Sequence, residues 1–162
     1  RRPLHIDMRA ADWVGPDRYE LRGDARRFEN WEFPYALVLG LGEAIRYARE
    51  VGIEMARARA WSLGDRLRSD LAASDGVWVL DRGPDLCAIV SVAVTGRSAH
   101  DVVTTLRAQG VNTSAVDRVS AVIDLDDKGV DTALRLSPHY FNTEAELRAA
   151  VSAIAALQRP GT

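Results

Sequence analysis

The stretch RLSPHYFNTEAEL, from Arg135 to Leu147, concentrates side chains that are suited to chemistry. It contains an arginine, a histidine, two aromatic rings and a helix-start pattern. Arg135 alternates with Leu134 and Leu136 in a short strand-like run, so its side chain should face away from the two leucines. Such an arginine is either a hydrated surface residue or a guanidinium that clamps a carboxylate through two parallel N–H···O bonds. The spacing leaves both roles open.

The rest of that stretch has a structural explanation. Pro138 lacks a backbone donor and restricts Ser137 to extended geometry, which ends the strand. Thr143 and Glu146 have the T-x-x-E spacing of a capping box, which predicts a helix that starts at Thr143. Arg135 is therefore the residue of this stretch that we single out as a candidate binding residue.

The sequence offers no lysine suited to a covalent bond with a carbonyl compound. Lys128 is the only lysine among 21 basic residues. It lies in DLDDKGVD, where the acids and the glycine predict an exposed turn and a hydrated ammonium. A lysine that reacts with a carbonyl needs a partly desolvated amine that loses its proton readily. No catalytic residue is therefore assigned in this chain.

Other chemical motifs are incomplete. The single cysteine, Cys87, excludes a disulfide framework and a cysteine-based metal site, and the apolar run around it predicts a buried position. His5, His100 and His139 have no second histidine at ligand spacing, so no metal site is expected. The pair of glycines in LGLGEA is followed by Ile45, where a dinucleotide fingerprint needs a third glycine. No serine has the G-x-S-x-G setting of a hydrolase.

The composition narrows the class of protein further. The net charge of −2 and the pI near 5.9 give no basic field for a nucleic acid. The sequence has no apolar run of membrane-spanning length and no signal-peptide pattern. One cysteine and no disulfide framework favour the cytoplasm. A hydrophobic content of 47% is enough for a real core.

The periodicity of apolar residues predicts an α+β fold, with a small, mostly antiparallel sheet and helices packed on one side. Residues 1–34 are polar and rich in Gly and Pro, which predicts an irregular, extended segment that packs on something else. Two long linking helices should follow, the first ending at Gly52. The remaining helices are expected at residues 98–110 and 143–157, and the strands within residues 77–94 and at 111–116, 119–125 and 132–137.

The same residues resemble a known family. RLSPHYFNTEAEL is similar to the closing motif of class V aminotransferases, which include cysteine desulfurases and isopenicillin N epimerase-like enzymes. ARRFENWEFPYALVLGLGEAIRYAREVGIE resembles the passage from their large domain into their small domain. AIVSVAVTGRSAHDVVTTLRAQGVNTS and DLDDKGVDTALRLSPHYFNTE resemble the small-domain core in the same order. The resemblance covers nearly the whole chain.

The resemblance implies the C-terminal part of a pyridoxal-phosphate enzyme of fold type I. Residues 1–34 would be the end of the large cofactor-binding domain, 35–52 a linking helix and 53–162 the small domain. The chain would be an inactive fragment that holds no covalent pyridoxal 5'-phosphate, because the coenzyme-binding lysine would precede Arg1. The missing large domain and a second copy in a homodimer would be partners of the parent protein.

Site residues follow from the same resemblance. Arg135 matches the arginine that binds the α-carboxylate of a small amino-acid substrate. Asn30, Trp31 and Glu32 occupy the place from which the family reaches the partner subunit's cofactor phosphate, although a carboxylate at residue 32 would repel it. Residues 112–120 lack the nucleophilic cysteine of the desulfurases, which leaves transamination, epimerisation or lyase chemistry. The alternative is a free-standing α/β module that binds a small ligand or a regulatory partner without catalysis.

Overall fold

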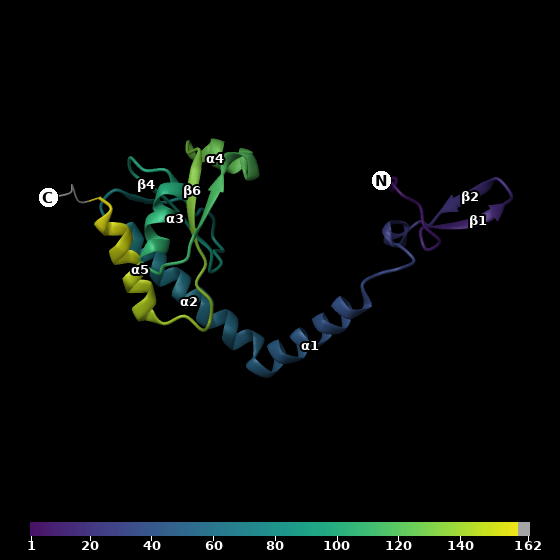
Figure 1. Cartoon of the computed structure of the whole chain (residues 1–162), viewed down its shortest axis with the longest axis horizontal. Helices are drawn as coiled ribbons and strands as arrows, with labels where there is room; N and C mark the ends of the chain where they lie inside the picture. Colours follow the sequence, from purple (N-terminus) through teal and green to yellow (C-terminus); the bar gives the residue numbers. More distant parts are fainter. Residues whose placement is uncertain (159–162) are drawn as a thin grey trace. The chain divides into compact units, whose positions relative to one another are not determined.

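The computed structural model describes residues 1–158, which form two compact units (Figure 1). The first unit is Arg1–Glu50, and the second is the chain from Val51 onward. The first contains a hairpin and most of one long helix. The second contains the main sheet and the hydrophobic core.

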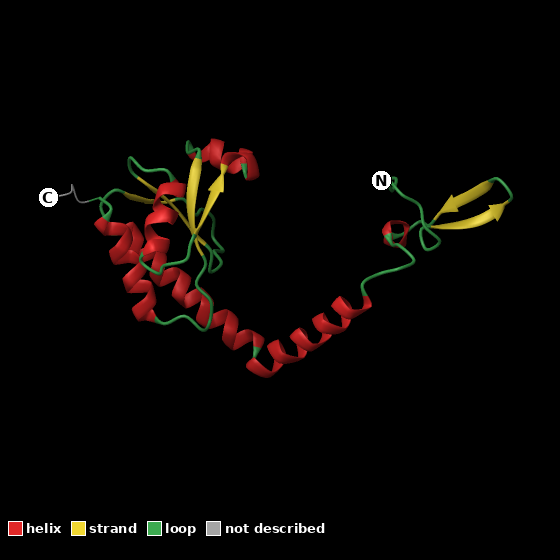
Figure 2. Cartoon of the chain, viewed as in Figure 1, coloured by secondary structure: helices red, strands yellow, loops and turns green. Residues whose placement is uncertain are grey.

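The first unit contains a two-stranded hairpin (Figure 2). Strand β1 (Ala11–Gly15) pairs antiparallel with β2 (Arg18–Leu21), and the short helix η1 (Ala25–Phe28) follows. The prediction of an irregular segment is therefore wrong where the hairpin lies. The sequence does not reveal the hairpin because strands of four or five residues are too short for a clear alternating pattern. Among the described hydrophobic residues of this unit, Ala10 is the only buried one.

Two consecutive helices, α1 (Tyr35–Val51) and α2 (Ile53–Ala72), meet at Gly52. The φ angle of Gly52 is +93°, a region that side chains other than glycine rarely adopt, which agrees with the predicted helix end. An apolar stripe on α2 is buried from the second turn onward, whereas Ile53 at its start is exposed. Its buried members are Ala60, Leu63, Leu67 and Leu71.

The main sheet is antiparallel throughout its described strands. Its order is β3-β4-β6-β5, so β6, the last strand in the sequence, lies between β4 and β5. The predicted strands at 77–94, 111–116 and 132–137 are thereby confirmed. The strands are β3 (Val77–Val79), β4 (Val90–Val94), β5 (Ser114–Asp117) and β6 (Thr132–Leu136).

Three helices cover one face of this sheet: α2, α3 (Ala99–Ala108) and α5 (Glu144–Ala156) (Figure 1). The α3 and α5 helices begin as predicted, capped by Ser98 and by the Thr143 capping box. The α+β class, with an antiparallel sheet and a helical layer, is confirmed. Burial of these side chains supplies the main stabilisation, at about 1.5–3 kcal/mol for each large one. The core includes Leu63, Leu71, Val90, Val92, Leu106, Leu134 and Ile154.

The opposite face of the sheet carries α4 (Val122–Lys128), which follows the short helix η2 (Arg118–Ser120). Leu125 packs there with Leu80 and Ala133 in a second, smaller cluster. The sequence pattern predicts a strand over residues 119–125, and this prediction is wrong. Ile123 is 88% exposed, so these residues do not pair in the sheet, and Leu125 alone is buried.

Candidate functional site

Arg135 lies on β6, on the face of the sheet opposite to the helical layer. Leu134 and Leu136 are buried in the main core, whereas Arg135 between them is exposed. Ala133, two residues before Arg135 and on the same face, is covered by Leu125 of α4. Because residues two apart in a strand are about 7 Å apart, Arg135 lies just beyond the area that Leu125 covers.

The register of the sheet places one serine on each side of Arg135. Ser91 of β4 and Ser114 of β5 are both directly opposite Arg135. We call these three residues the Arg135 row. Within residues 1–158, the Arg135 guanidinium has no hydrogen-bond or ion-pair partner, and neither serine hydroxyl has one. The row is therefore a cation flanked by two hydroxyls, with its donors available to a ligand.

Arg68 on α2 shows the opposite arrangement. It is 9% exposed, and its Nε donates to Asp81 at 2.8 Å, while its other nitrogens donate to Asp65 and to the carbonyls of Cys87 and Ile89. Asp81 also accepts the backbone N–H of Ser91 at 3.0 Å. Arg68 therefore holds the loop between β3 and β4 against α2, and its donors are committed to the fold.

The remainder of the RLSPHYFNTEAEL stretch is a strand-to-helix joint, as expected. Pro138 is buried, and a turn follows in which the Asn142 N–H donates to the carbonyl of His139 at 2.9 Å. Glu146 accepts hydrogen bonds from the Thr143 backbone N–H, the Asn142 amide and the Thr143 hydroxyl, which together lower the pKa of its carboxyl. The rings of His139, Tyr140 and Phe141 contact one another at 4.6–5.5 Å between centroids.

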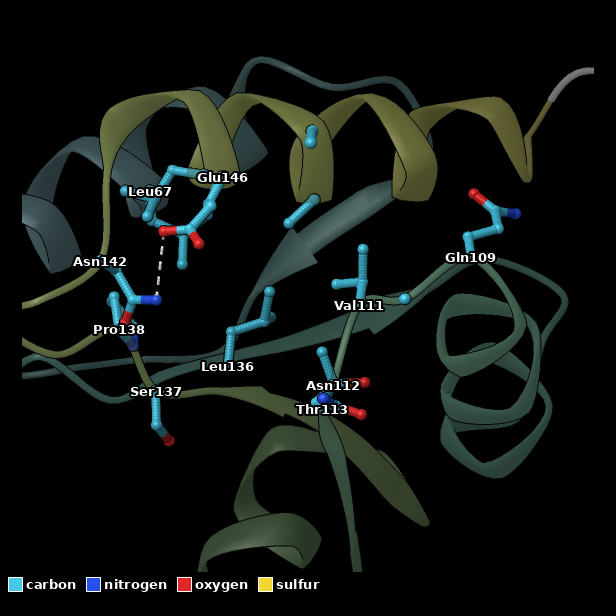
Figure 3. Close-up of a pocket in the computed structure, with 14 residues that line it drawn as sticks. Leu67, Gln109, Val111, Asn112, Thr113, Leu136, Ser137, Pro138, Asn142 and Glu146 are labelled. Carbon is cyan, nitrogen blue, oxygen red and sulfur yellow. Dashed lines mark hydrogen bonds between the residues drawn. The ribbon is translucent and has the colours of Figure 1, made fainter.

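A cavity of about 420 Å³ lies beside this joint (Figure 3). Asn142 and Glu146 lie at the end of the cavity where α5 begins, and the Asn142 amide donates to Glu146 at 3.4 Å. Leu67 and Leu136 contribute apolar walls. Thr113 also lines the cavity, and its hydroxyl is buried without a hydrogen-bond partner. The cavity has the size and mixed lining of a small-ligand site.

The sequence predicts an exposed turn at Lys128, and this prediction is wrong. Lys128 is the last residue of α4, its side chain is only 10% exposed, and its ammonium lies 2.7 Å from the Asp124 carboxylate. The helix extends to Lys128 because Gly129, in the left-handed region, ends it. The ammonium is held by a carboxylate of its own helix, so Lys128 does not fit covalent attachment of a coenzyme.

Cys87 is exposed, which corrects the buried position predicted from the apolar residues around it. It lies in the loop between β3 and β4 rather than in β4, because β4 starts only at Val90. His100 contacts Asp117 at 2.7 Å and lies on the surface. No group of three or more metal-ligating side chains occurs among the described residues, and none of their helices could cross a bilayer.

Asn30 and Glu32, with Phe33, line a second cavity of about 420 Å³ in the first unit. The backbone N–H of the neighbouring Trp31 donates to Asp7 at 3.0 Å. Arg9, which the sequence did not single out, also lines the cavity.

The charges of this cavity do not suit a phosphate group. Arg9 lies 3.9 Å from Glu29 and 5.5 Å from the Trp31 ring centroid. Two carboxylates, Glu29 and Glu32, face one guanidinium, so the cavity carries a net negative charge and a phosphate does not fit it.

The serines of the Arg135 row were also missed from the sequence. Alternation in AIVSVAV already places Ser91 on the face opposite to Val90 and Val92. Which strand lies beside which is a tertiary property, and no local signal contains it.

Comparison with known proteins gives a consistent family. The family model described as Aminotransferase class-V matches residues 2–149. A probable cysteine desulfurase of Xylella fastidiosa (strain 9a5c) is 30% identical over 116 residues, which are 72% of this chain and 28% of that protein. A probable cysteine desulfurase of Halobacterium salinarum is 32% identical over 117 residues, with the same coverage. The chain thus spans about 28% of the length of these relatives.

Solved structures agree on the fold. The cysteine desulfurase CsdA from Escherichia coli matches with a TM-score of 0.79 at 24% identity, over 96% of this chain and 38% of that chain. A mutant of the lyase C-DES, with glycine covalently linked to its pyridoxal-phosphate cofactor, matches with a TM-score of 0.68 at 18% identity, over 94% and 37%. At these identities the likeness establishes the fold alone.

Proposed function

Since the chain belongs to the aminotransferase class-V family, we propose that it forms the substrate-side part of an enzyme that acts on an amino acid. In this proposal Arg135 binds the α-carboxylate of the substrate. The observation that carries the proposal is the exposed guanidinium of Arg135, which has no partner among the described residues. Arg68, by contrast, is fully engaged inside the fold.

The role of Arg135 is orientation. A guanidinium presents two parallel N–H groups that match the two oxygens of a carboxylate. Two such bonds fix the acid group in one plane, so the bonds at the α-carbon point in defined directions. The coenzyme of the family, pyridoxal phosphate, supplies an electron sink when bound. Lys128 and the cavity around Glu32 do not suit it, so the proposal assigns its binding to the rest of the enzyme.

The sequence supports a reaction without a cysteine of this chain. Residues 112–120 contain none, and Cys87 lies in the loop between β3 and β4 with its carbonyl bound to Arg68. We therefore propose that the enzyme is not a desulfurase that transfers sulfur to this segment, although relatives are named as desulfurases. Transamination, epimerisation and lyase cleavage remain.

The first unit supports an assembly with further protein. Leu37, Leu39 and Leu41 on α1 are 60–72% exposed, and α1 has no buried residue among those described. Because exposed apolar surface of this extent is a feature of interfaces, we propose that it packs on the large domain of the family or on the second subunit of a cytoplasmic homodimer.

A non-catalytic ligand-binding module is the second candidate, and the cavity beside α5 favours it. In that case residues 1–34 would be expected to complete the hydrophobic core. Ala10 is the only buried hydrophobic residue described in the first unit, so residues 1–34 enclose no core of their own, which supports the first candidate.

The proposal is tested by Arg135→Ala in the enzyme that contains this chain. Loss of even one hydrogen bond to a charged group costs about 1.5–3 kcal/mol, so KM for the amino acid should rise by at least about 10- to 100-fold. Arg66→Ala is a matched control, since Arg66 is an exposed arginine on α2 that pairs only with Asp70. An unchanged KM and kcat in Arg135→Ala would refute the assignment.

A second test uses the 162-residue chain alone. Pyridoxal phosphate is added, and free coenzyme is then removed by gel filtration. We expect no absorbance band at about 410 nm, because the chain has no lysine suited to covalent attachment. A stable band that disappears in Lys128→Ala would contradict this expectation.

A further inference from the structure

Helix α4 and the short helix η2 before it expose apolar side chains on the Arg135 side of the sheet. Val119, Val122 and Ile123 lie within five consecutive residues and are 83%, 42% and 88% exposed. We name these three residues the α4 patch. We propose that the patch is buried against the coenzyme-binding domain of the enzyme that contains this chain, so that α4 lies between the sheet and that domain. This inference rests on the proposed role of Arg135.

Helix α4 is apolar on two opposite sides. Leu125 is 2% exposed and packs on Leu80 and Ala133 of the sheet. Successive residues of an α-helix are about 100° apart around its axis, so Ile123, two residues before Leu125, points to the opposite side of the helix. A surface helix normally has one apolar side and one polar side. A helix that is apolar on both sides fits between two layers of protein.

The helices on the other face of the sheet do not share this feature. Among the described large hydrophobic residues of α3 and α5, none is exposed. Helix α4 lies apart from these helices and from α2 (Figure 1). Single exposed apolar residues are common on proteins, whereas neighbouring ones mark interaction sites. The α4 patch is therefore a local feature of the Arg135 side of the sheet.

The charges of α4 are compatible with burial under another domain. All four charged residues of the helix are in ion pairs within this chain. The ion pairs are Asp124–Lys128, Asp126–Arg118 and Asp127–Arg82. Burial is most costly for a charge without a partner, and the centre of an interface is poor in charged residues. A surface that packs on α4 leaves none of these charges unpaired.

The position of Arg135 indicates which domain covers the patch. Arg135 and Ala133 lie on the same side of β6, and Leu125 of α4 covers Ala133. In the proposed function, the coenzyme must reach a substrate that Arg135 holds, and neither Lys128 nor the cavity around Glu32 suits the coenzyme. The domain that carries the coenzyme therefore approaches the side of the sheet on which the α4 patch lies. The relatives have room for such a domain, since this chain spans about 28% of their length.

Thiol labelling at residue 123 tests whether the patch is buried. Ile123→Cys is made in the enzyme that contains this chain and in the 162-residue chain alone, with Cys87→Ser in both because Cys87 is exposed. Mass spectrometry of the peptide that contains residue 123 measures its rate of reaction with iodoacetamide. We expect a rate at least about tenfold lower in the enzyme, because a buried thiol reacts only when the interface opens. Equal rates would overturn the inference.

Ser152→Cys is the matched control, because Ser152 is exposed on α5, which covers the other face of the sheet. Its labelling rate should be the same in the enzyme and in the 162-residue chain. Equal slowing at residues 123 and 152 would mean that the α4 patch is not specifically covered, and would also overturn the inference. Val119→Cys replaces Ile123→Cys if the latter fails to fold, which thermal unfolding of the chain reveals.

Photo-cross-linking identifies the surface that covers the patch. With p-benzoylphenylalanine in place of Ile123 in the enzyme, irradiation should form cross-links to peptides of the coenzyme-binding domain. Cross-links to a second copy of residues 1–162 instead would overturn the inference.

These outcomes are distinct from those of Arg135→Ala. If Arg135→Ala raises KM and residue 123 is labelled equally in both proteins, the burial of the α4 patch is wrong and the role of Arg135 stands. If residue 123 is protected and cross-linked to the coenzyme-binding domain but Arg135→Ala has no effect, the α4 interface stands and the role of Arg135 fails.

Discussion

The helices α1 and α2 are neighbours in the sequence and are both rich in apolar residues, but they differ in burial. Leu63, Leu67 and Leu71 of α2 are 0–2% exposed, whereas Leu41 and Ile45 of α1 are 60% and 50% exposed. The buried stripe of α2 packs on the strands and helices of the second unit, whereas Ala10 is the only buried hydrophobic residue described in the first unit. The contrast teaches that apolar residues in a helix predict that some surface will pack against it. Whether those residues are buried depends on which other elements lie beside the helix.

The largest change in the free energy of unfolding is expected for Arg68→Ala, which tests whether ionic contacts as well as apolar ones hold α2 in place. Arg68→Ala leaves the mostly buried Asp81 carboxylate without its cation and leaves the Cys87 and Ile89 carbonyls without a donor. Removing one partner of a buried pair costs about 3–5 kcal/mol. Urea unfolding should show that the free energy of unfolding falls by this amount.

Arg66→Ala, on the same helix, is the matched control. Its pair with Asp70 is exposed, so its removal should cost under about 1 kcal/mol. If Arg68→Ala and Arg66→Ala lower the free energy of unfolding equally, the burial of Arg68 adds nothing to its contribution to stability.

The next effect compares the two helices directly. Leu71→Ala should destabilise the second unit by about 2–5 kcal/mol, because a fully buried leucine is replaced by a cavity. Leu41→Ala on α1 should change stability by less than about 0.5 kcal/mol in this chain, because Leu41 is exposed. Urea unfolding, followed by circular dichroism, measures both.

The same pair of variants can sharpen the interpretation of α1. If α1 packs on other protein in the complete enzyme, Leu41→Ala should become destabilising there and stay neutral in the 162-residue chain. A neutral result in both would argue against an interface on that part of α1.

The smallest expected effect is a pH dependence of stability that comes from Glu146 in the second unit. The Glu146 pKa lies below its ordinary value of 4.5, chiefly because the Thr143 N–H donates to the carboxylate. A carboxyl with a lowered pKa in the folded state stabilises the fold above pH 4.5, and this stabilisation is lost as the pH falls through the folded-state pKa.

Glu146→Gln should therefore lower Tm slightly near pH 7 and match the wild type in strong acid. Glu144→Gln, an exposed carboxylate of the same helix turn, is the control. A Tm difference that persists unchanged at low pH would show that the charge of Glu146 is not its cause.

Several local features were predictable because they depend on neighbours in sequence. The capping box of Thr143 and Glu146, the Ser98 cap and the glycine between α1 and α2 need only residues within one helix turn. The side of β6 on which Arg135 lies follows from the two-residue period of a strand. The family resemblance could also be read from the sequence, because its motifs are continuous.

Other features depended on contacts between distant residues and were predicted wrongly or missed. The apolar pattern of residues 119–125 indicates a strand, but Leu125 packs on Leu80 and Ala133 from the short helix α4 instead. Cys87 looked buried because its neighbours are apolar, yet the chain at that point is a loop that Arg68 and Asp81 hold in place.

The sequence by itself determined that Arg135 faces away from Leu134 and Leu136, since only the alternation of side chains along a strand is needed for that. It also determined that the chain lacks a suitable lysine, because Lys128 is the only one. The tertiary structure alone decided that β6 lies between β4 and β5, and so that Ser91 and Ser114 flank Arg135. The physical reason is that strand pairing joins residues as distant in the sequence as Ser91 and Arg135, and it is selected by the fit of the whole core rather than by local preference.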